Sequence, residues 1–256
     1  MKELIESLNL PKQIIDKTEK LISVLFGEGF KEIGSMFGDR MRLKRLKNQI
    51  DIFNEASKIM EANGLTPHQI NLKTLVPLLE KSSLEEDENL QKNWANLIAN
   101  IASTKINGIE PKLIETLSSL SSIEVAILDF LYESFLEKRT QKFKESSSRK
   151  YSSYKNIEDV KPDRILFTSS IVKNKFVLTN EFTIIYLENL QSIGLLRNAD
   201  PDIEIEDNFS EAEIVEQKNN EPSIDLNLNI SANYSRSEDF HFTAYGIYFV
   251  QQCKGN

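Results

Sequence analysis

The chain has 256 residues, of which 40% are hydrophobic and 27% charged, and this is the composition of an ordinary globular protein. Its formal net charge of −8 argues against a protein that wraps nucleic acid through many phosphate contacts, because such proteins are usually basic. The single cysteine, Cys253, cannot form an internal disulfide and so fits a reducing compartment. The sequence shows neither a signal-peptide pattern nor an apolar run of about 18 residues, and we therefore expect a cytoplasmic protein.

Amphipathic helical spacing dominates the first 63 residues, where apolar side chains recur every three or four positions. We predict a glycine-interrupted helical segment over residues 12–37 and a second helix over residues 39–63, which Gly64 ends. The first segment carries more apolar surface than one small helical domain can cover, and a basic cluster follows it. Because exposed stripes of this kind mark interfaces, we expect a contact surface here. Its candidate residues are Ile22, Phe26, Phe30, Ile33, Phe37, Arg42 and Arg45.

A capping pattern predicts the start of the next long helix. Ser83 is followed three residues later by Glu86, so each side chain can satisfy a free backbone N–H of the first turn. The acidic residues 85–88 complement the positive end of the helix dipole, and a metal site explains them less well because consecutive helical residues point in different directions. Trp94 shares the apolar face of this helix with Leu90 and Leu97, and we expect it to anchor the core.

The second half of the chain mixes helices with short strands. We predict helices over residues 123–136, 179–193 and 244–253, and a hairpin that pairs residues 224–230 with residues 240–243. The polar segment 138–177 and the acidic segment 198–222 are expected as insertions at the surface.

The predicted fold class is mainly α, in two domains. Residues 1–120 form an amphipathic helical domain. Residues 121–256 form a winged-helix-like α+β domain with a small antiparallel hairpin, into which the two insertions are set.

Three stretches of the chain together carry a family resemblance. The first is Arg45-Leu46-Lys47-Asn48, and the second runs from Leu75-Val76-Pro77 through Ser83-Leu84-Glu85-Glu86-Asp87 to Trp94-Ala95-Asn96-Leu97-Ile98-Ala99-Asn100. The third joins Tyr186-Leu187-Glu188-Asn189-Leu190 to Phe242-Thr243-Ala244-Tyr245-Gly246 and Phe249-Val250-Gln251-Gln252-Cys253. They resemble the abortive-infection alpha family of bacterial phage-defence proteins. The resemblance implies that infected cells stop growing or die before phage matures, and it supplies no catalytic residues.

Little in the sequence points to catalysis, so we expect a protein that is not an enzyme and that holds no cofactor or metal. Arg236 and His241 have the spacing of a class of helical ribonucleases, but His241 stands between two phenylalanines in a strand-like run. A zinc site needs three or four converging ligands, and the whole chain has two histidines and one cysteine. No phosphate-binding glycine loop is present.

The leading interpretation is a phage-defence component that acts non-enzymatically through protein–protein contacts, as a homo-oligomer held by residues 12–40, with a phage or host protein as a further candidate partner. Two alternatives stay open. One is a membrane-active growth-arrest toxin that lays its amphipathic N-terminal helix on the membrane surface. The other is a ribonuclease that uses Arg236 and His241. Residues 180–193 offer no lysine or arginine to a DNA groove, so we expect no specific DNA binding. Arg42 and Arg45 have the simpler interpretation of a solvated helix face.

Overall fold

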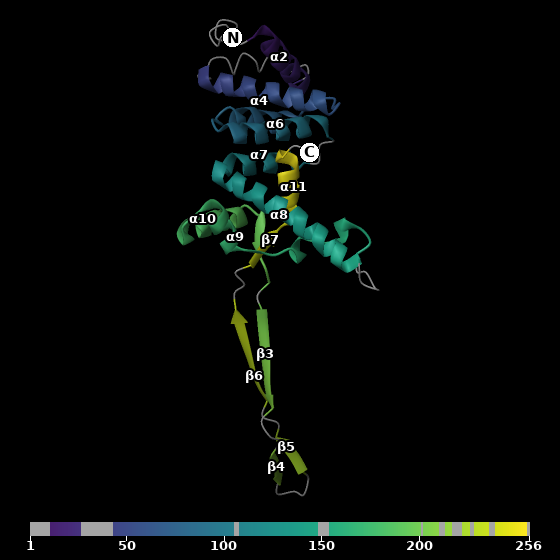
Figure 1. Cartoon of the computed structure of the whole chain (residues 1–256), viewed down its shortest axis with the longest axis vertical. Coiled ribbons are helices and arrows are strands. Elements are labelled where there is room, and N and C mark those ends of the chain that lie inside the picture. The colour runs from purple at the N-terminus through teal and green to yellow at the C-terminus, as the bar shows by residue number, and fades with distance from the viewer. Residues whose placement is uncertain are drawn as a thin grey trace.

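The structure is a computed structural model that describes residues 11–26, 43–104, 108–147, 154–200, 202–209, 213–216, 222–225, 228–235 and 239–254. This described part is mainly α, as predicted. Its helices stack in layers to form a body, and a two-stranded ribbon projects from one end of that body (Figure 1).

The helices of the first half form successive layers. They are α2 (Lys12–Phe26), α4 (Leu43–Ala62), α5 (Leu72–Ser82), α6 (Glu88–Ser103) and α7 (Glu110–Ser119). Helix α4 lies between α2 and α6 and packs against both (Figure 1). The end of α4 was predicted correctly, because Gly64 adopts a left-handed φ of +63° and turns the chain out of the helix. Trp94 of α6 is 1% exposed and therefore lies in the core, as predicted.

The predicted cap of α6 at Ser83 is wrong, because Asp87 caps the helix instead. The Asp87 carboxylate accepts hydrogen bonds from the backbone N–H groups of Asn89 and Leu90, at 2.9 and 3.0 Å. Aspartate caps a helix as well as serine does, so the sequence offers two equivalent starting points. Ser83 is fully buried at the end of α5, where its hydroxyl accepts hydrogen bonds from Arg45 of α4. A tertiary contact thus removes Ser83 from the capping role.

The second half places a small sheet on the helical layers. It begins with α8 (Ser122–Ser147), two short 3-10 turns, η2 (Ile157–Asp159) and η3 (Pro162–Arg164), and strand β1 (Phe167–Thr168). Helices α9 (Ser169–Phe176) and α10 (Asn180–Ser192) precede strand β2 (Leu196–Asn198), and the chain closes with β7 (Asp239–Phe242) and α11 (Ala244–Cys253). The predicted boundaries of α10 hold: Thr179 caps it and Gly194, with a φ of +80°, follows its end.

Strand β7 is the centre of the three-stranded sheet, and this corrects two predictions. It pairs antiparallel with β1 and with β2, so Phe240 lies opposite both Phe167 and Asn198. The predicted hairpin between residues 224–230 and 240–243 is therefore wrong. Residues 138–177 are also more than a surface insertion, because α8 continues to Ser147 and four of their apolar side chains are buried in the core. These are Val160, Ile165, Phe167 and Val172.

The acidic segment after β2 contains strands. Strand β3 (Asp202–Phe209) pairs antiparallel with β6 (Leu228–Ser235), and β4 (Glu213–Glu216) pairs with β5 (Pro222–Asp225). The β3–β6 ribbon points away from the helices, and β4 and β5 lie beyond its far end (Figure 1).

Both halves of the body contribute to one continuous apolar core. The cluster of buried side chains runs from Leu21 and Phe53 through Trp94 to Phe242 and Val250. The division at residue 120 stays a prediction, and so does the winged-helix assignment. None of the described helices is long and apolar enough to cross a lipid bilayer.

Candidate interaction surface

The predicted interface over residues 12–40 is partly occupied by the protein's own core. Leu21 and Leu25 of α2 are buried, and Ile22 is partly buried against the same cluster. Lys17 of α2 also forms an ion pair with Glu61 of α4 at 2.9 Å. Much of the apolar face of α2 is thus covered within the chain. Phe30, Ile33, Phe37 and Arg42 lie outside the described residues, as does the side chain of Phe26.

Arg45, the remaining candidate, holds two helices together. Its guanidinium donates to the hydroxyl of Ser83 at 2.9 and 3.0 Å and to the backbone carbonyl of Glu80 at 3.4 Å. Asn48 and Gln49, one turn further along α4, donate to the carbonyls of Ser83 and Leu79. These carbonyls lie at the C-terminal end of α5, and that of Leu79 also accepts from the backbone N–H of Ser83 at 3.2 Å. Arg45 and Asn48 of the first family stretch therefore act in packing α4 against α5.

The other family stretches meet around α11. The side chain of Asn100 in α6 donates to the carbonyl of Gln252 at 2.8 Å, and Gln251 donates to the hydroxyl of Tyr132 in α8. The hydroxyl of Tyr245 forms a 2.7 Å hydrogen bond with Thr116 of α7. Helix α11 is thus tied to three helices that lie more than 100 residues earlier in the chain.

The start of α11 is fitted tightly against the backbone before β2. The hydroxyl of Thr243 caps α11 by accepting from the N–H of Gly246, and it donates to the carbonyl of Gly194 at 2.6 Å. A Cβ atom placed on Gly246 would lie 2.0 Å from the carbonyl oxygen of Leu195. Only glycine allows this approach.

Of the candidate catalytic pair, the structure describes His241 alone. His241 lies in β7, and its Nδ1 is 2.9 Å from the carbonyl of Phe242; Arg236 lies outside the described residues. Burial raises the pKa of the Cys253 thiol well above its usual range, which keeps it in the unreactive thiol form. No group of three or more histidine, cysteine, aspartate or glutamate side chains among the described residues could hold a metal ion.

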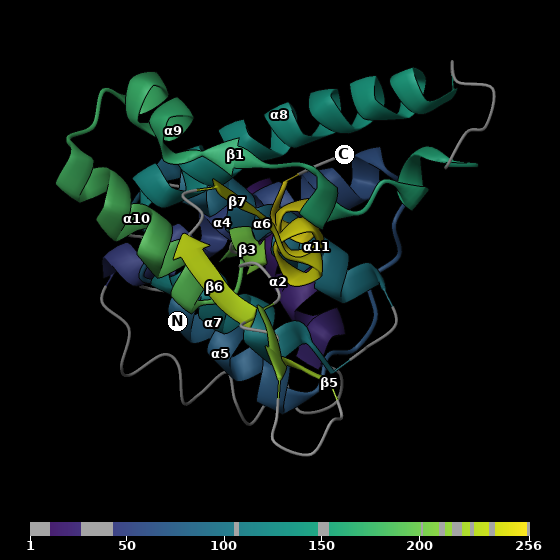
Figure 2. The ribbon, with the colours of Figure 1, turned by 90° about the horizontal axis from the view of Figure 1, so that it is seen from below.

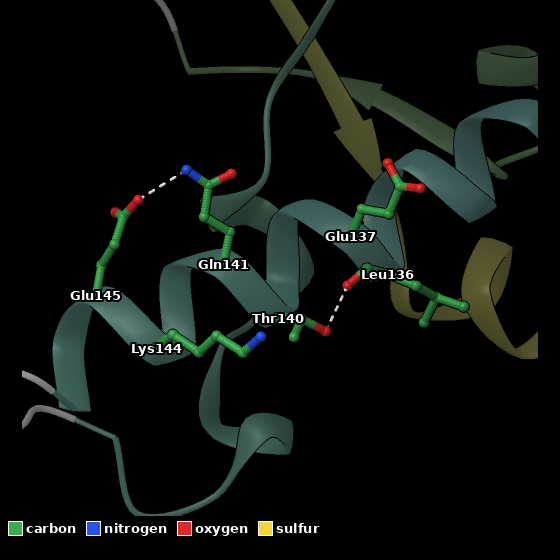
Figure 3. A pocket seen from close by; sticks show the side chains of 6 residues that line it. All are labelled: Leu136, Glu137, Thr140, Gln141, Lys144 and Glu145. Atoms are coloured by element: carbon green, nitrogen blue, oxygen red, sulfur yellow. Dashed lines mark hydrogen bonds between the residues drawn. The ribbon is translucent and has the colours of Figure 1, made fainter.

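The hollow along the second half of α8 is lined by one helix. Its lining residues are Leu136, Glu137, Thr140, Gln141, Lys144 and Glu145 (Figure 3). Gln141 donates to Glu145 at 2.8 Å, so these two polar groups satisfy each other along the helix (Figure 3). Because none of these residues comes from a second element, the hollow cannot enclose a small molecule.

The exposed apolar residues concentrate on α10 and on the turn before it. Phe182, Ile184 and Ile185 are 53%, 52% and 55% exposed. Val177, the turn residue that follows α9, is 89% exposed. Phe182 stacks on Tyr186 one turn later, with ring centroids 6.3 Å apart. Helix α10 lies at one edge of the body, and no other described helix covers its outer side (Figures 1 and 2). We call Val177, Phe182, Ile184 and Ile185 the α10 surface.

A groove runs beside the α10 surface, between α9, α10 and the sheet. It has a volume of about 590 Å³ and is lined by Ile184 and Leu187 together with polar groups. Among these are Lys173 of α9 and Glu188 of α10. At its far end Gln191 donates to Asn198 at 2.7 Å. The α10 surface thus lies beside a groove with one positive and one negative side chain, and such a combination can bind a segment of another protein chain.

Sequence reasoning missed the α10 surface, although a signal was present. Residues 182–187 of α10 include apolar side chains on every side of the helix rather than in one stripe. A helix in one layer of a body buries only one face, so the excess apolar residues must be exposed or covered by a partner. The sequence alone could not show which side faces outward.

The fold and the surface define a mainly helical protein whose most distinctive exposed feature is an apolar contact surface. The family model described as abortive infection alpha matches residues 38–253, and the chain therefore belongs to this family. No curated protein and no solved structure matches the chain. Membership of the family supports a role in defence against phage, as the resemblance implied.

Proposed function

We propose that the protein acts in phage defence without catalysis, as a homo-oligomer that binds a further phage or host protein through the α10 surface. The observation that carries this proposal is the exposure of Phe182 and Ile185, each more than half exposed, on an edge helix. Isolated apolar side chains at a protein surface are common, but Phe182 and Ile185 lie one turn apart on α10, and Phe182 also stacks on Tyr186. Neighbouring exposed apolar groups of this kind mark contact surfaces.

The chemistry of α10 favours a protein partner over duplex DNA. Its charged residues are Glu181 and Glu188, and both are exposed. Carboxylates repel the phosphate backbone, and α10 has neither lysine nor arginine to contact it.

The two alternative mechanisms gain no support from the geometry. The membrane-toxin hypothesis needs a free apolar face on the N-terminal helix, but Leu21 and Leu25 of α2 are buried against the body. The ribonuclease hypothesis needs an arginine and a histidine on one helix face, whereas His241 lies on the central strand of the sheet.

The test is phage protection by variants of the α10 surface. The wild type and the double variant Phe182→Asp, Ile185→Asp are expressed in a phage-sensitive host, and plaques and surviving cells are counted. The matched control is Leu84→Asp, since Leu84 is 63% exposed and lies far along the chain, outside the α10 surface. We expect the control to protect like the wild type and the double variant to lose protection. Equal protection by all three proteins would overturn the proposal.

A further inference from the structure

The β3–β6 ribbon has two faces of opposite character. Directly paired residues of an antiparallel ladder share a face, and successive pairs alternate between the two faces. The register places on one face the pairs Ile203–Tyr234, Ile205–Ala232, Asp207–Ile230 and Phe209–Leu228. The opposite face carries the pairs Asp202–Ser235, Glu204–Asn233, Glu206–Ser231 and Asn208–Asn229. Seven of the eight residues on the first face are apolar, and all eight on the second are polar. We call these the apolar face and the polar face of the ribbon.

The apolar face of this ribbon must pack against another structural layer for the ribbon to be stable in water. A two-stranded hairpin alone is marginally stable in water, and it becomes stable when its apolar face packs against another layer. In the described part of the structure the ribbon projects away from the helices, and no helix lies along it (Figure 1). The described helices therefore do not supply the layer that the apolar face needs.

We propose that this cover is the ribbon of a second copy of the chain. Two ribbons packed through their apolar faces form a four-stranded β-sandwich with a two-fold axis, and both polar faces stay in water. Contact through the polar faces would oppose Asp202, Glu204 and Glu206 of one copy to those of the other, so charge selects the apolar face. A second copy is present whenever the protein is, whereas a phage protein arrives only on infection.

The available area suits such a dimer. Burial of the two aromatic and four larger aliphatic residues of the apolar face removes roughly 500–1,000 Å² per copy. A stable protein interface needs about 800 Å² per partner. The upper part of this range matches a standard interface, so the ribbons can supply the dimer contact without the helical bodies. The α10 surface then stays free for another protein.

This inference rests on the homo-oligomer named in the proposed function and assigns the surface that forms it. The test compares Ile205→Asp, on the apolar face, with Asn208→Asp, on the polar face of the same strand. Each variant introduces one carboxylate into β3. We expect light scattering to show a dimer for the wild type and for Asn208→Asp. For Ile205→Asp we expect the dissociation constant of the dimer to rise by about a hundredfold or more, because each dimer then buries two new charges.

Folding and function are followed separately in the same samples. The single tryptophan, Trp94, is 1% exposed in the helical body, so an unchanged emission spectrum shows that the body is folded. A monomeric wild type, or an Ile205→Asp variant that dimerises like Asn208→Asp, overturns the ribbon inference. Plaque counts then test the proposed defence role independently. If the protein is monomeric but its protection against phage still depends on Phe182, the defence role is supported and only the dimer is contradicted.

Discussion

Replacing Gly246 by alanine should destabilise the protein, because α11 lies directly on the backbone before β2. The added Cβ would lie 2.0 Å from the carbonyl oxygen of Leu195 and 2.9 Å from its carbonyl carbon. An unstrained carbon–oxygen contact is about 3.3–3.6 Å, so the two segments must move apart by more than about 1 Å. Leu195 is fully buried, and its carbonyl accepts a hydrogen bond from the N–H of Thr243 at 3.1 Å. Neither segment can move without disturbing its packing.

The cost of Gly246→Ala follows from these contacts. Overpacking in a core costs about 1–3 kcal/mol, and weakening the hydrogen bond to Leu195 adds about 1 kcal/mol. The higher helix propensity of alanine returns about 0.5–1 kcal/mol. The net loss is then about 1–3.5 kcal/mol. Its central value of about 2 kcal/mol should lower the melting temperature by about 4–8 °C in a chain of this size.

The assay is thermal unfolding followed by circular dichroism, with Gly64→Ala as the control. Gly64 has a φ of +63°, and no atom lies within 4 Å of the position that an added Cβ would occupy. Its replacement therefore costs only the left-handed backbone strain of about 1–2 kcal/mol. We expect Gly246→Ala to unfold at a lower temperature than Gly64→Ala. An unchanged melting temperature for Gly246→Ala would refute the close packing of α11 on Leu195.

Four further predictions concern single side chains. Trp94→Ala should cost about 3–5 kcal/mol in denaturant unfolding, since its ring is buried. Arg45→Lys should destabilise by about 1–2 kcal/mol, because lysine cannot reproduce the forked contact with Ser83. Burial raises the pKa of Asp129, so the charge of this carboxylate opposes folding. Asp129→Asn should therefore raise the melting temperature at pH 7. The gain should shrink as the pH falls towards about 4, because the wild-type carboxyl then becomes protonated. Cys253 should react with a thiol reagent on the order of a hundredfold faster in denaturant than in the folded protein. Equal rates would show that the thiol is accessible.

Local signals in the sequence predicted several helix ends correctly, although α9 and the second half of α8 were not predicted. Thr179 and Gly194 bound α10, and Gly64 ends α4, because capping side chains and left-handed glycines act through their immediate neighbours. Trp94 was placed in the core because its spacing with Leu90 and Leu97 defines one helix face.

Strand pairing, the cap of α6 and the exposed side of α10 depend on contacts between distant parts of the chain, so they could not be predicted from local sequence. Any alternating segment can pair with any other, so the sequence offered no reason for β7 to choose β1, which lies about 70 residues earlier, over a neighbouring strand. Ser83 and Asp87 are equally good caps by sequence, and the hydrogen bond from Arg45 to the hydroxyl of Ser83 distinguishes them only in the folded structure. Helix α10 has apolar residues on all sides, so its sequence does not show which side is exposed. The packing of the helical layers determines this.

The proposed function requires that the α10 surface contact another protein during infection, and crosslinking at position 182 detects that contact. A photoreactive phenylalanine analogue replaces Phe182 in one strain and Leu84 in another, and cells are irradiated before and after phage infection. We expect a discrete protein adduct at position 182 that Ile185→Asp abolishes, and none at position 84. A protective protein that forms no adduct at position 182, or forms the same adduct at both positions, would contradict the proposed function.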